Sequence, residues 1–160
     1  TEGWFAMVRK WHGWKTTDLD PTESIYGEDL YGIHALDYGP IPEDRTFRPF
    51  NYLTNKTFLS YDDREYFFKD LGMESVPLIF RGVFNTEKEL SRFLSDEIKR
   101  VSSITNEGVE REGFVIQTTD EFAFDDFSNH VCKYVRANHV QSNKHWRYNW
   151  KPCRILPPVG

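Results

Sequence analysis

The 160-residue sequence has only two cysteines, Cys132 and Cys153, and lacks a C-x-x-C pair. This excludes the usual cysteine spacing of zinc and dithiol redox sites, and we expect both residues to be reduced thiols. No run approaches the ~18 consecutive apolar residues that a membrane-spanning helix requires. The segment that starts at Thr1 has neither the basic nor the apolar region of a secretory signal. We therefore expect an intracellular chain, cytoplasmic or nuclear, that has no membrane partner.

The length is that of a single domain over residues 1–160, and the sequence contains no internal repeats. Helical spacing and capping residues predict helices over 4–11, from Ser60 to Gly72, and over 86–98. Residues typical of strands occupy 25–36 with a bend, 47–53, 76–82, 113–117 and 131–135. Pro49 within 47–53 predicts an edge or irregular strand. Because strands and helices do not alternate regularly, we expect the α+β class.

Acidic residues outnumber basic ones, and the net charge of −5 argues at first against nucleic-acid binding. The distribution of charge is uneven, however. Residues 127–160 contain six Lys or Arg and no Asp or Glu, which leaves a net charge of −11 on the rest of the chain. The six are Lys133, Arg136, Lys144, Arg147, Lys151 and Arg154. Two interpretations stay open, namely a surface that binds nucleic acid and a chance surplus of charge on a solvated face.

Three short patterns carry candidate chemistry. Tyr26-Gly27-Glu28-Asp29-Leu30-Tyr31-Gly32 places a glutamate at the end of a strand, beside a glycine that would let the backbone approach a ligand. Glu112-Gly113-Phe114-Val115-Ile116 opens an apolar strand with a carboxylate, and Val131-Cys132-Lys133-Tyr134-Val135-Arg136 sets a lysine within one. Taken singly, each glutamate also fits a solvated turn, and the lysine fits an edge strand protected against aggregation.

In this order, and with His139-Val140-Gln141 after the last, the three patterns resemble the covalent nucleotidyltransferase superfamily and, within it, the ATP-dependent RNA ligases. The resemblance spans about residues 4–145. It implies an antiparallel-sheet nucleotidyltransferase (ATP-grasp-like) domain that uses ATP and Mg²⁺ or Mn²⁺ to join RNA 5′-phosphate and 3′-hydroxyl ends. Such ligases proceed through enzyme-AMP and RNA-adenylate intermediates.

The resemblance also implies how the nucleoside is held. Glu28 would accept hydrogen bonds from the ribose hydroxyls, for which a carboxylate is suited. An aromatic residue between the first two patterns would stack on adenine. Phe50 is the first choice and Phe47 the second, although either also fits a plain core position.

The phosphate end follows from the other two patterns. By resemblance, Glu112 would help hold the divalent metal, which suits a hard carboxylate oxygen. Lys133 would contact the α-phosphate as negative charge develops there. The family usually carries a second basic residue in that strand. Here the position is Val135, so either Arg136 or no residue supplies it. Gln117 also departs from the family pattern, which often has a basic residue there.

The lysine nucleophile of the family, within a Lys-x-x-Gly motif, is not convincingly present. Lys10-Trp11-His12-Gly13 fits the letters. Only 17 residues separate Lys10 from Glu28, however, which is too few for two intervening strands with their turns. The neighbours of Lys10 also predict a helix, so a surface lysine is the favoured interpretation. We expect the chain to be the C-terminal part of a longer ligase, with the missing N-terminal segment as its partner, or else an adenylylation-deficient homologue.

Two rival interpretations remain. A non-catalytic RNA-binding module would use the basic stretch with Trp146, Tyr148 and Trp150 as stacking surfaces. A zinc site would need His130, Cys132, His139 and His145, whose spacing matches no familiar finger. His34 is interpreted as an ordinary hydrogen-bonded polar residue.

Overall fold

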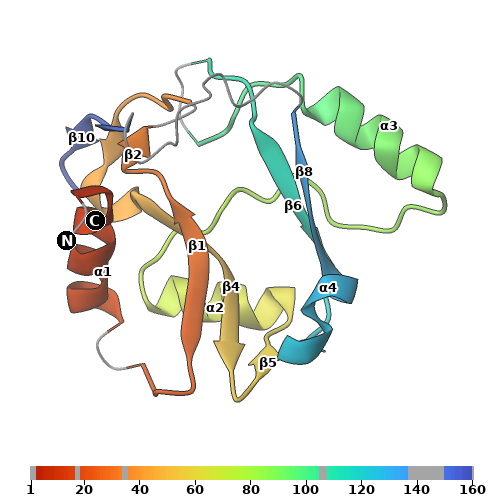
Figure 1. Cartoon of the computed structure of the whole chain (residues 1–160), viewed down its shortest axis with the longest axis horizontal. Coiled ribbons are helices and arrows are strands. Elements are labelled where there is room, and N and C mark those ends of the chain that lie inside the picture. The colour runs from red at the N-terminus through yellow and green to blue at the C-terminus, as the bar shows by residue number, and fades with distance from the viewer. Residues whose placement is uncertain (1–2, 17–18, 34–35, 105–107, 137–149, 160) are drawn as a thin grey trace.

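The computed structural model describes residues 3–16, 19–33, 36–104, 108–136 and 150–159 (Figure 1). The helices are α1 (Ala6–Lys15), α2 (Tyr61–Asp70), α3 (Glu87–Glu97) and α4 (Phe127–His130), with 3₁₀ turns η1 (Gly3–Phe5), η2 (Glu43–Arg45) and η3 (Phe124–Asp126). The strands are β1 (Ser24–Asp29), β2 (Gly32–Ile33), β3 (Ile41–Pro42), β4 (Phe47–Thr54), β5 (Thr57–Phe58), β6 (Gly113–Gln117), β7 (Phe122–Ala123), β8 (Val131–Val135), β9 (Lys151–Pro152) and β10 (Ile155–Leu156). This mixture confirms the α+β class.

The main sheet has four antiparallel strands in the order β1-β4-β5-β7. The turn between β4 and β5 consists of Asn55 and Lys56, both with positive φ (47° and 62°). Two such residues are characteristic of the tight hairpin turn whose twist matches that of its strands. Three two-stranded sheets complete the fold: β6 with β8 and β2 with β9, both antiparallel, and β3 with β10, which is parallel. Residues Ile41 and Pro42, between β2 and η2, thus form a short strand.

Strand β4 is irregular, as Pro49 predicts, but it is not an edge strand. It lies between β1 and β5, and the edge alternative is therefore wrong. Tyr26 pairs with Asn51 and Gly27 with Pro49, so Phe50 has no partner in β1. This is a β-bulge, which redirects the side chain of the extra residue. The proline is tolerated because β5 pairs only with the far end of β4, at Leu53 and Thr54.

Helices α1 and α2 pack against the main sheet and close its core. Trp11, Tyr52, Phe68 and Met73 form this core, and the first three are at most 2% exposed. The Trp11 indole donates a hydrogen bond to Thr46 Oγ1 (3.3 Å), which satisfies its buried N–H. Helix α1 continues to Lys15, beyond the predicted range of 4–11. The other two predicted helices are confirmed.

An aromatic cluster holds the β6–β8 hairpin to the main sheet. Phe58 of β5 packs against Phe122, Phe124 and Phe127, with ring centroids 5.0 to 6.0 Å apart. These three residues lie in β7, η3 and α4, which connect β6 to β8 in the chain. The hairpin therefore lies beside the four-stranded sheet, as Figure 1 shows. Both of its strands have the predicted bounds.

The expected strand at 76–82 is wrong. This segment runs without regular structure from α2 toward α3, and Leu78 and Phe80 are 54% and 45% exposed. The Val76 N–H donates to the Pro49 carbonyl (3.0 Å), but Pro77 has no N–H to continue a ladder. The segment instead forms part of a cavity wall.

Candidate functional site

Glu28 is placed by the bulged pairing of β1 with β4. Gly27, next to it, is required there because an added Cβ would lie 2.5 Å from the Phe47 ring and 2.6 Å from the Arg48 carbonyl oxygen. The backbone of β1 thus approaches β4 closely at Gly27. Glu28 follows opposite Arg48 and lies at the cavity.

The β6–β8 hairpin places the second carboxylate and the lysine. Glu112 precedes β6, and its carbonyl accepts a hydrogen bond from the Arg136 N–H (2.9 Å). Lys133 pairs with Val115 across the hairpin. Because residues opposite each other in an antiparallel pair share a face, Lys133 lies on the same side as Val115. At Gly113 an added Cβ would lie 2.3 Å from the Tyr134 carbonyl oxygen, so this position also requires glycine.

A cavity of about 460 Å³ lies between the main sheet, the hairpin, α3 and the segment that includes residues 76–82. Glu28, Phe50, Glu112 and Lys133 all line it, although they are up to 105 residues apart in the chain. Phe50 reaches it as the bulged residue of β4. Phe47, the second choice for stacking, packs against the core instead. Volumes of 300–1,000 Å³ are typical of small-molecule sites, so a nucleotide is of suitable size.

The sheet side of the cavity holds two titratable groups that the sequence analysis missed. Burial raises the pKa of Asp29 to about 6, against a hydrogen bond from the Tyr31 N–H that lowers it. Burial also raises the pKa of Tyr38 to about 12, helped by the negative charges of Glu112 and Glu28. The Tyr38 phenol is therefore close to both carboxylates and stays protonated as a donor. No sequence pattern around Tyr38 indicates this position.

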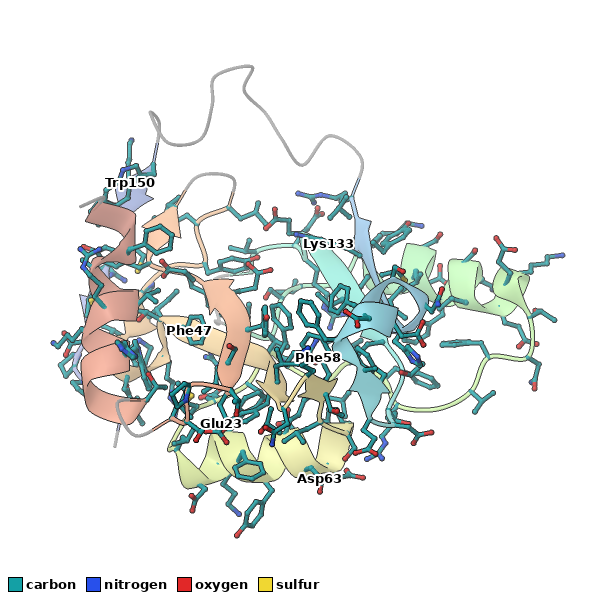
Figure 2. The ribbon with its side chains drawn as sticks, turned by 60° about the horizontal axis from the view of Figure 1, so that its bottom comes forward. Glu23, Phe47, Phe58, Asp63, Lys133 and Trp150 are labelled. Atoms are coloured by element: carbon teal, nitrogen blue, oxygen red, sulfur yellow. The ribbon has the colours of Figure 1, made fainter. Side chains whose placement is uncertain are left out.

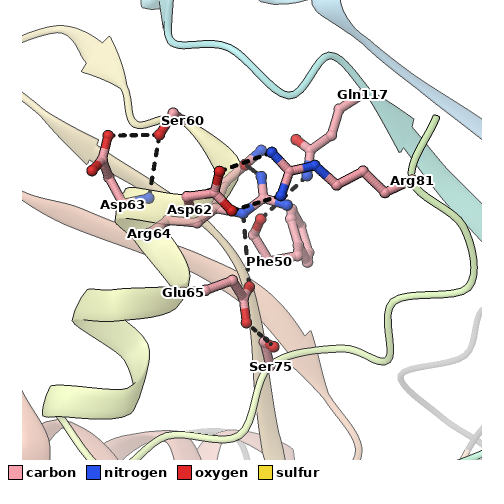
Figure 3. A network of polar contacts seen from close by, with 10 residues as sticks. Phe50, Ser60, Asp62, Asp63, Arg64, Glu65, Ser75, Arg81 and Gln117 are labelled. Carbon is pink, nitrogen blue, oxygen red and sulfur yellow. Dashed lines mark hydrogen bonds and ion pairs between the residues drawn. The ribbon is translucent and has the colours of Figure 1, made fainter. Parts of the chain in front are cut away.

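Five cationic side chains line the cavity, and they differ in how their charge is matched. Three arginines are paired with a carboxylate: Arg48 with Glu74, Arg81 with Asp62, and Arg111 with Glu97. Lys133 has no ion pair within the described part of the chain, and its position is labelled in Figure 2. The fifth is Arg64, in the polar network of Figure 3.

Two predicted residues lie outside the cavity. Arg136 is not among the lining residues, and its guanidinium forms an ion pair with Glu110. Its charge nevertheless acts on Tyr38, which places it near the rim. Lys10 lies on α1 and pairs with Glu43. That position agrees with the expected surface lysine on a helix.

The fit of a divalent metal depends on how many protein ligands it needs. No group of three or more His, Cys, Asp or Glu residues suited to a metal occurs within the described ranges. This does not fit an all-protein cage. It fits Mg²⁺ held by one carboxylate, such as Glu112, together with substrate phosphates and water. Of the four residues in the rival zinc interpretation, His139 and His145 lie outside the described residues, and His130 contacts Asp126 and Thr118.

Several residues of the basic stretch lie outside the described residues: His139, Val140, Gln141, Lys144, Trp146, Arg147 and Tyr148. His34 does too. Trp150 is described and packs on Tyr31, with ring centroids 6.1 Å apart. Within the described residues, no helix is long and apolar enough to cross a membrane.

The described residues form an α+β fold whose cavity of about 460 Å³ is lined by acidic and basic side chains. A family model of RNA ligases matches residues 3–135, and the chain belongs to the RNA ligase family. This confirms the resemblance given by the three sequence patterns.

Curated relatives add a second similarity. The chain is 31% identical over 112 residues to the proline–tRNA ligases of Mycoplasma mycoides and Mycoplasma capricolum. The match covers 68% of this chain but 23% of each relative, so the chain spans about a quarter of their length. No solved structure matches the chain, and a nucleotidyltransferase fold is thus not confirmed by a structural neighbour.

Proposed function

We propose that this chain is the nucleotide-binding part of an ATP-dependent RNA ligase that seals RNA 5′-phosphate and 3′-hydroxyl ends. The observation that carries the proposal is the shared cavity of Glu28, Phe50, Glu112 and Lys133. Three separate sequence patterns contribute these residues. Independent surface positions would have no reason to converge, whereas a single ligand explains their convergence.

Each residue has a chemical role in this proposal. Glu28 accepts hydrogen bonds from the ribose, and Phe50, redirected by the bulge, stacks on adenine. Glu112 binds the divalent ion, which neutralises phosphate charge when bound. Lys133 stabilises the α-phosphate in the transition state, and its lack of an ion pair in the described chain leaves its charge available for this. Arg136 adds a more distant positive charge at the rim.

Lys10 is not the nucleophile in this proposal. Lys10 is on a helix away from the cavity and is paired with Glu43. A nucleophilic lysine must reach the α-phosphate, which Lys133 and Glu112 position. The chain by itself thus supplies the ribose, metal and phosphate contacts without the covalent step.

The test is ATP binding, measured by isothermal titration calorimetry with Mg²⁺ present. We expect Glu28→Ala and Lys133→Gln each to weaken ATP binding about tenfold, the effect of losing one hydrogen bond to a charged group. Glu121→Ala is the matched control, because Glu121 is exposed and does not line the cavity. Equal affinities in all four proteins, or no ATP binding by the wild type, would overturn the proposal.

The uneven charge supports one competing proposal, a non-catalytic RNA-binding module. That function predicts salt-sensitive RNA affinity that does not change in Glu28→Ala or Glu112→Ala. Both curated relatives are named for tRNA, so tRNA is the first RNA to use as a probe. RNA binding without ATP binding would favour the module over the ligase.

A further inference from the structure

Arg64 occupies the first turn of α2, directly beside the cavity. It is 5% exposed, yet it is one of the lining residues. Figure 3 shows its guanidinium within a network that includes Phe50 and Gln117. A hydrogen bond from the Tyr61 N–H to the Thr119 carbonyl (2.8 Å) ties this turn of α2 to the end of the hairpin. Arg64 is therefore held where the two walls of the cavity meet.

The charge of Arg64 is poorly matched by its surroundings. Its Nη1 donates to Asn51 Oδ1 (2.7 Å), and its buried Nε has no hydrogen-bond partner among the described residues. The nearest carboxylate oxygen, from Glu65, is 3.9 Å away, and the other oxygen of Glu65 accepts from Ser75 Oγ (2.7 Å). The ring of Tyr61 lies 5.0 Å from the guanidinium carbon. A guanidinium has five N–H donors, and the described residues accept a hydrogen bond from only one guanidinium nitrogen of Arg64.

The other arginines of the cavity differ from Arg64 in that each has a carboxylate at hydrogen-bond distance. Arg81 makes two hydrogen bonds to Asp62, of 2.6 and 2.8 Å, and Arg111 donates to Glu97. Arg48 pairs with Glu74. A buried charge without a close counter-ion is costly, and such a group is normally matched by an acidic side chain or by a bound anion. At Arg64 the described chain offers no acidic side chain at hydrogen-bond distance.

We propose that Arg64 forms a second phosphate-binding position in the cavity, separate from that of Lys133. The inference rests on the proposed function, which brings phosphorylated ligands to this site. A planar guanidinium binds two phosphate oxygens at once, which is the geometry that an ammonium group lacks. The ligand is a phosphoryl group, contributed either by the β- and γ-phosphates of ATP or by the 5′-phosphate of RNA.

The first arm of the test uses nucleotides and the full chain. Calorimetry compares ATP with adenosine for the wild type, for Arg64→Gln, and for Lys69→Gln as a control that removes one charge from an exposed position of the same helix. We expect Arg64→Gln to weaken ATP binding about tenfold and to leave adenosine binding unchanged. The control should match the wild type.

The second arm uses a short RNA that carries either a 5′-phosphate or a 5′-hydroxyl, with binding followed by fluorescence anisotropy. A preference for the 5′-phosphate that disappears in Arg64→Gln assigns the position to RNA. A loss confined to ATP assigns it to the nucleotide. If Arg64→Gln changes neither the ATP-to-adenosine ratio nor the 5′-phosphate preference, the proposal is wrong.

A second variant covers the case in which Arg64→Gln does not fold. Asn51→Asp keeps the shape of the side chain and places a carboxylate 2.7 Å from Arg64 Nη1. This internal counter-ion should compete with phosphate. The affinity for ATP, or for the RNA with a 5′-phosphate, should therefore fall about tenfold, while the melting temperature does not fall. Unchanged phosphate binding in a folded Asn51→Asp protein would overturn the proposal.

Inorganic tripolyphosphate separates this inference from the proposed function. If the wild type binds ATP in a Glu28-dependent way and Arg64→Gln binds every phosphate probe normally, only the second phosphate position fails. If the wild type binds no ATP but binds tripolyphosphate through Arg64, the ligase proposal fails and the phosphate position stands.

Discussion

The two walls of the cavity differ in how they are packed. The sheet wall, β1 and β4, is backed by Trp11, Tyr52 and Phe68, which are almost completely buried. In the hairpin wall, β6 has only half-buried residues, and three of the five residues of β8 are exposed. The sheet wall is thus held in place by a core, and the hairpin wall is held in place by the aromatic cluster around Phe58. Regions with few buried apolar contacts open at lower free energy than a core.

The functional groups are divided between these walls. Glu28 and Phe50, which we assign to the nucleoside, lie on the packed side, whereas Glu112 and Lys133 lie on the hairpin side. We infer that the nucleoside is held by the more rigid wall, and that the phosphate contacts come from the wall that is easier to adjust. Stability and phosphate chemistry should therefore respond to different substitutions.

The largest expected effect tests the packing difference directly. Phe68→Ala removes a ring that is 1% exposed, and we expect a loss of about 3–5 kcal/mol in the free energy of unfolding. Tyr134 is a half-buried residue of β8, and its ring stacks on Phe114 with the centroids 6.2 Å apart. Because this pair is partly open to solvent, Tyr134→Ala should cost about 1 kcal/mol. Urea denaturation measures both. Equal losses would show that the two walls are packed equally well.

An intermediate effect is expected from Asp29, whose pKa is raised by burial to about 6 from 3.8. The folded chain binds this proton more tightly than the unfolded chain, so folding stability falls as pH rises from about 4 to about 6. Asp29→Asn removes this dependence and keeps an acceptor for the Tyr31 N–H. We therefore compare the free energy of unfolding of Asp29→Asn with that of the wild type at each pH. After allowance for partial exposure, this difference should be about 1–2 kcal/mol more in favour of the variant at pH 7 than at pH 4.

Denaturation at both pH values measures that gain, with Asp37→Asn as an exposed control close in sequence. If the free energies of unfolding of Asp29→Asn and the wild type differ by the same amount at pH 4 and pH 7, the pKa of Asp29 is not raised. The sheet wall would then lack the desolvated carboxyl that distinguishes it from the hairpin wall.

Local signals predicted much of the fold. Serine and threonine caps marked α2 and α3, because Ser60 and Thr86 accept hydrogen bonds from backbone N–H groups three residues later. β-Branched and aromatic residues marked β6 and β8. The prediction of a strand at 76–82 was wrong because an apolar run indicates a tendency to be buried, but it does not indicate whether a partner strand is present. The prediction of an edge strand at β4 was wrong because β5, which is only two residues long, pairs with the far end of β4 and leaves Pro49 without a strand partner on that side.

The candidate site was predictable where motifs carry it and not elsewhere. Glu28, Glu112 and Lys133 were found from their patterns, and Phe50 from its position between two of them. Tyr38 and Arg64 were missed, because each is brought to the cavity by tertiary packing alone. The bulge at Phe50, which lines the cavity whereas Phe47 packs against the core, depends on the register of β1 with β4. The sequence of β4 by itself does not determine that register.

The smallest expected effect concerns Lys10, which belongs to neither wall. It lies on α1, is paired with Glu43, and does not line the cavity. An attacking amine must lie within ~3–3.5 Å of phosphorus in line with the leaving group, and binding energy cannot bring a helix residue across the core of the main sheet. Incubation of the chain with radiolabelled ATP and Mg²⁺ should therefore give no covalent adenylate, and Lys10→Ala should give the same result. A labelled band that disappears in Lys10→Ala would make Lys10 the nucleophile. It would also require α1 to rearrange against the sheet wall, and so would reverse the assignment of that wall as the rigid side of the site.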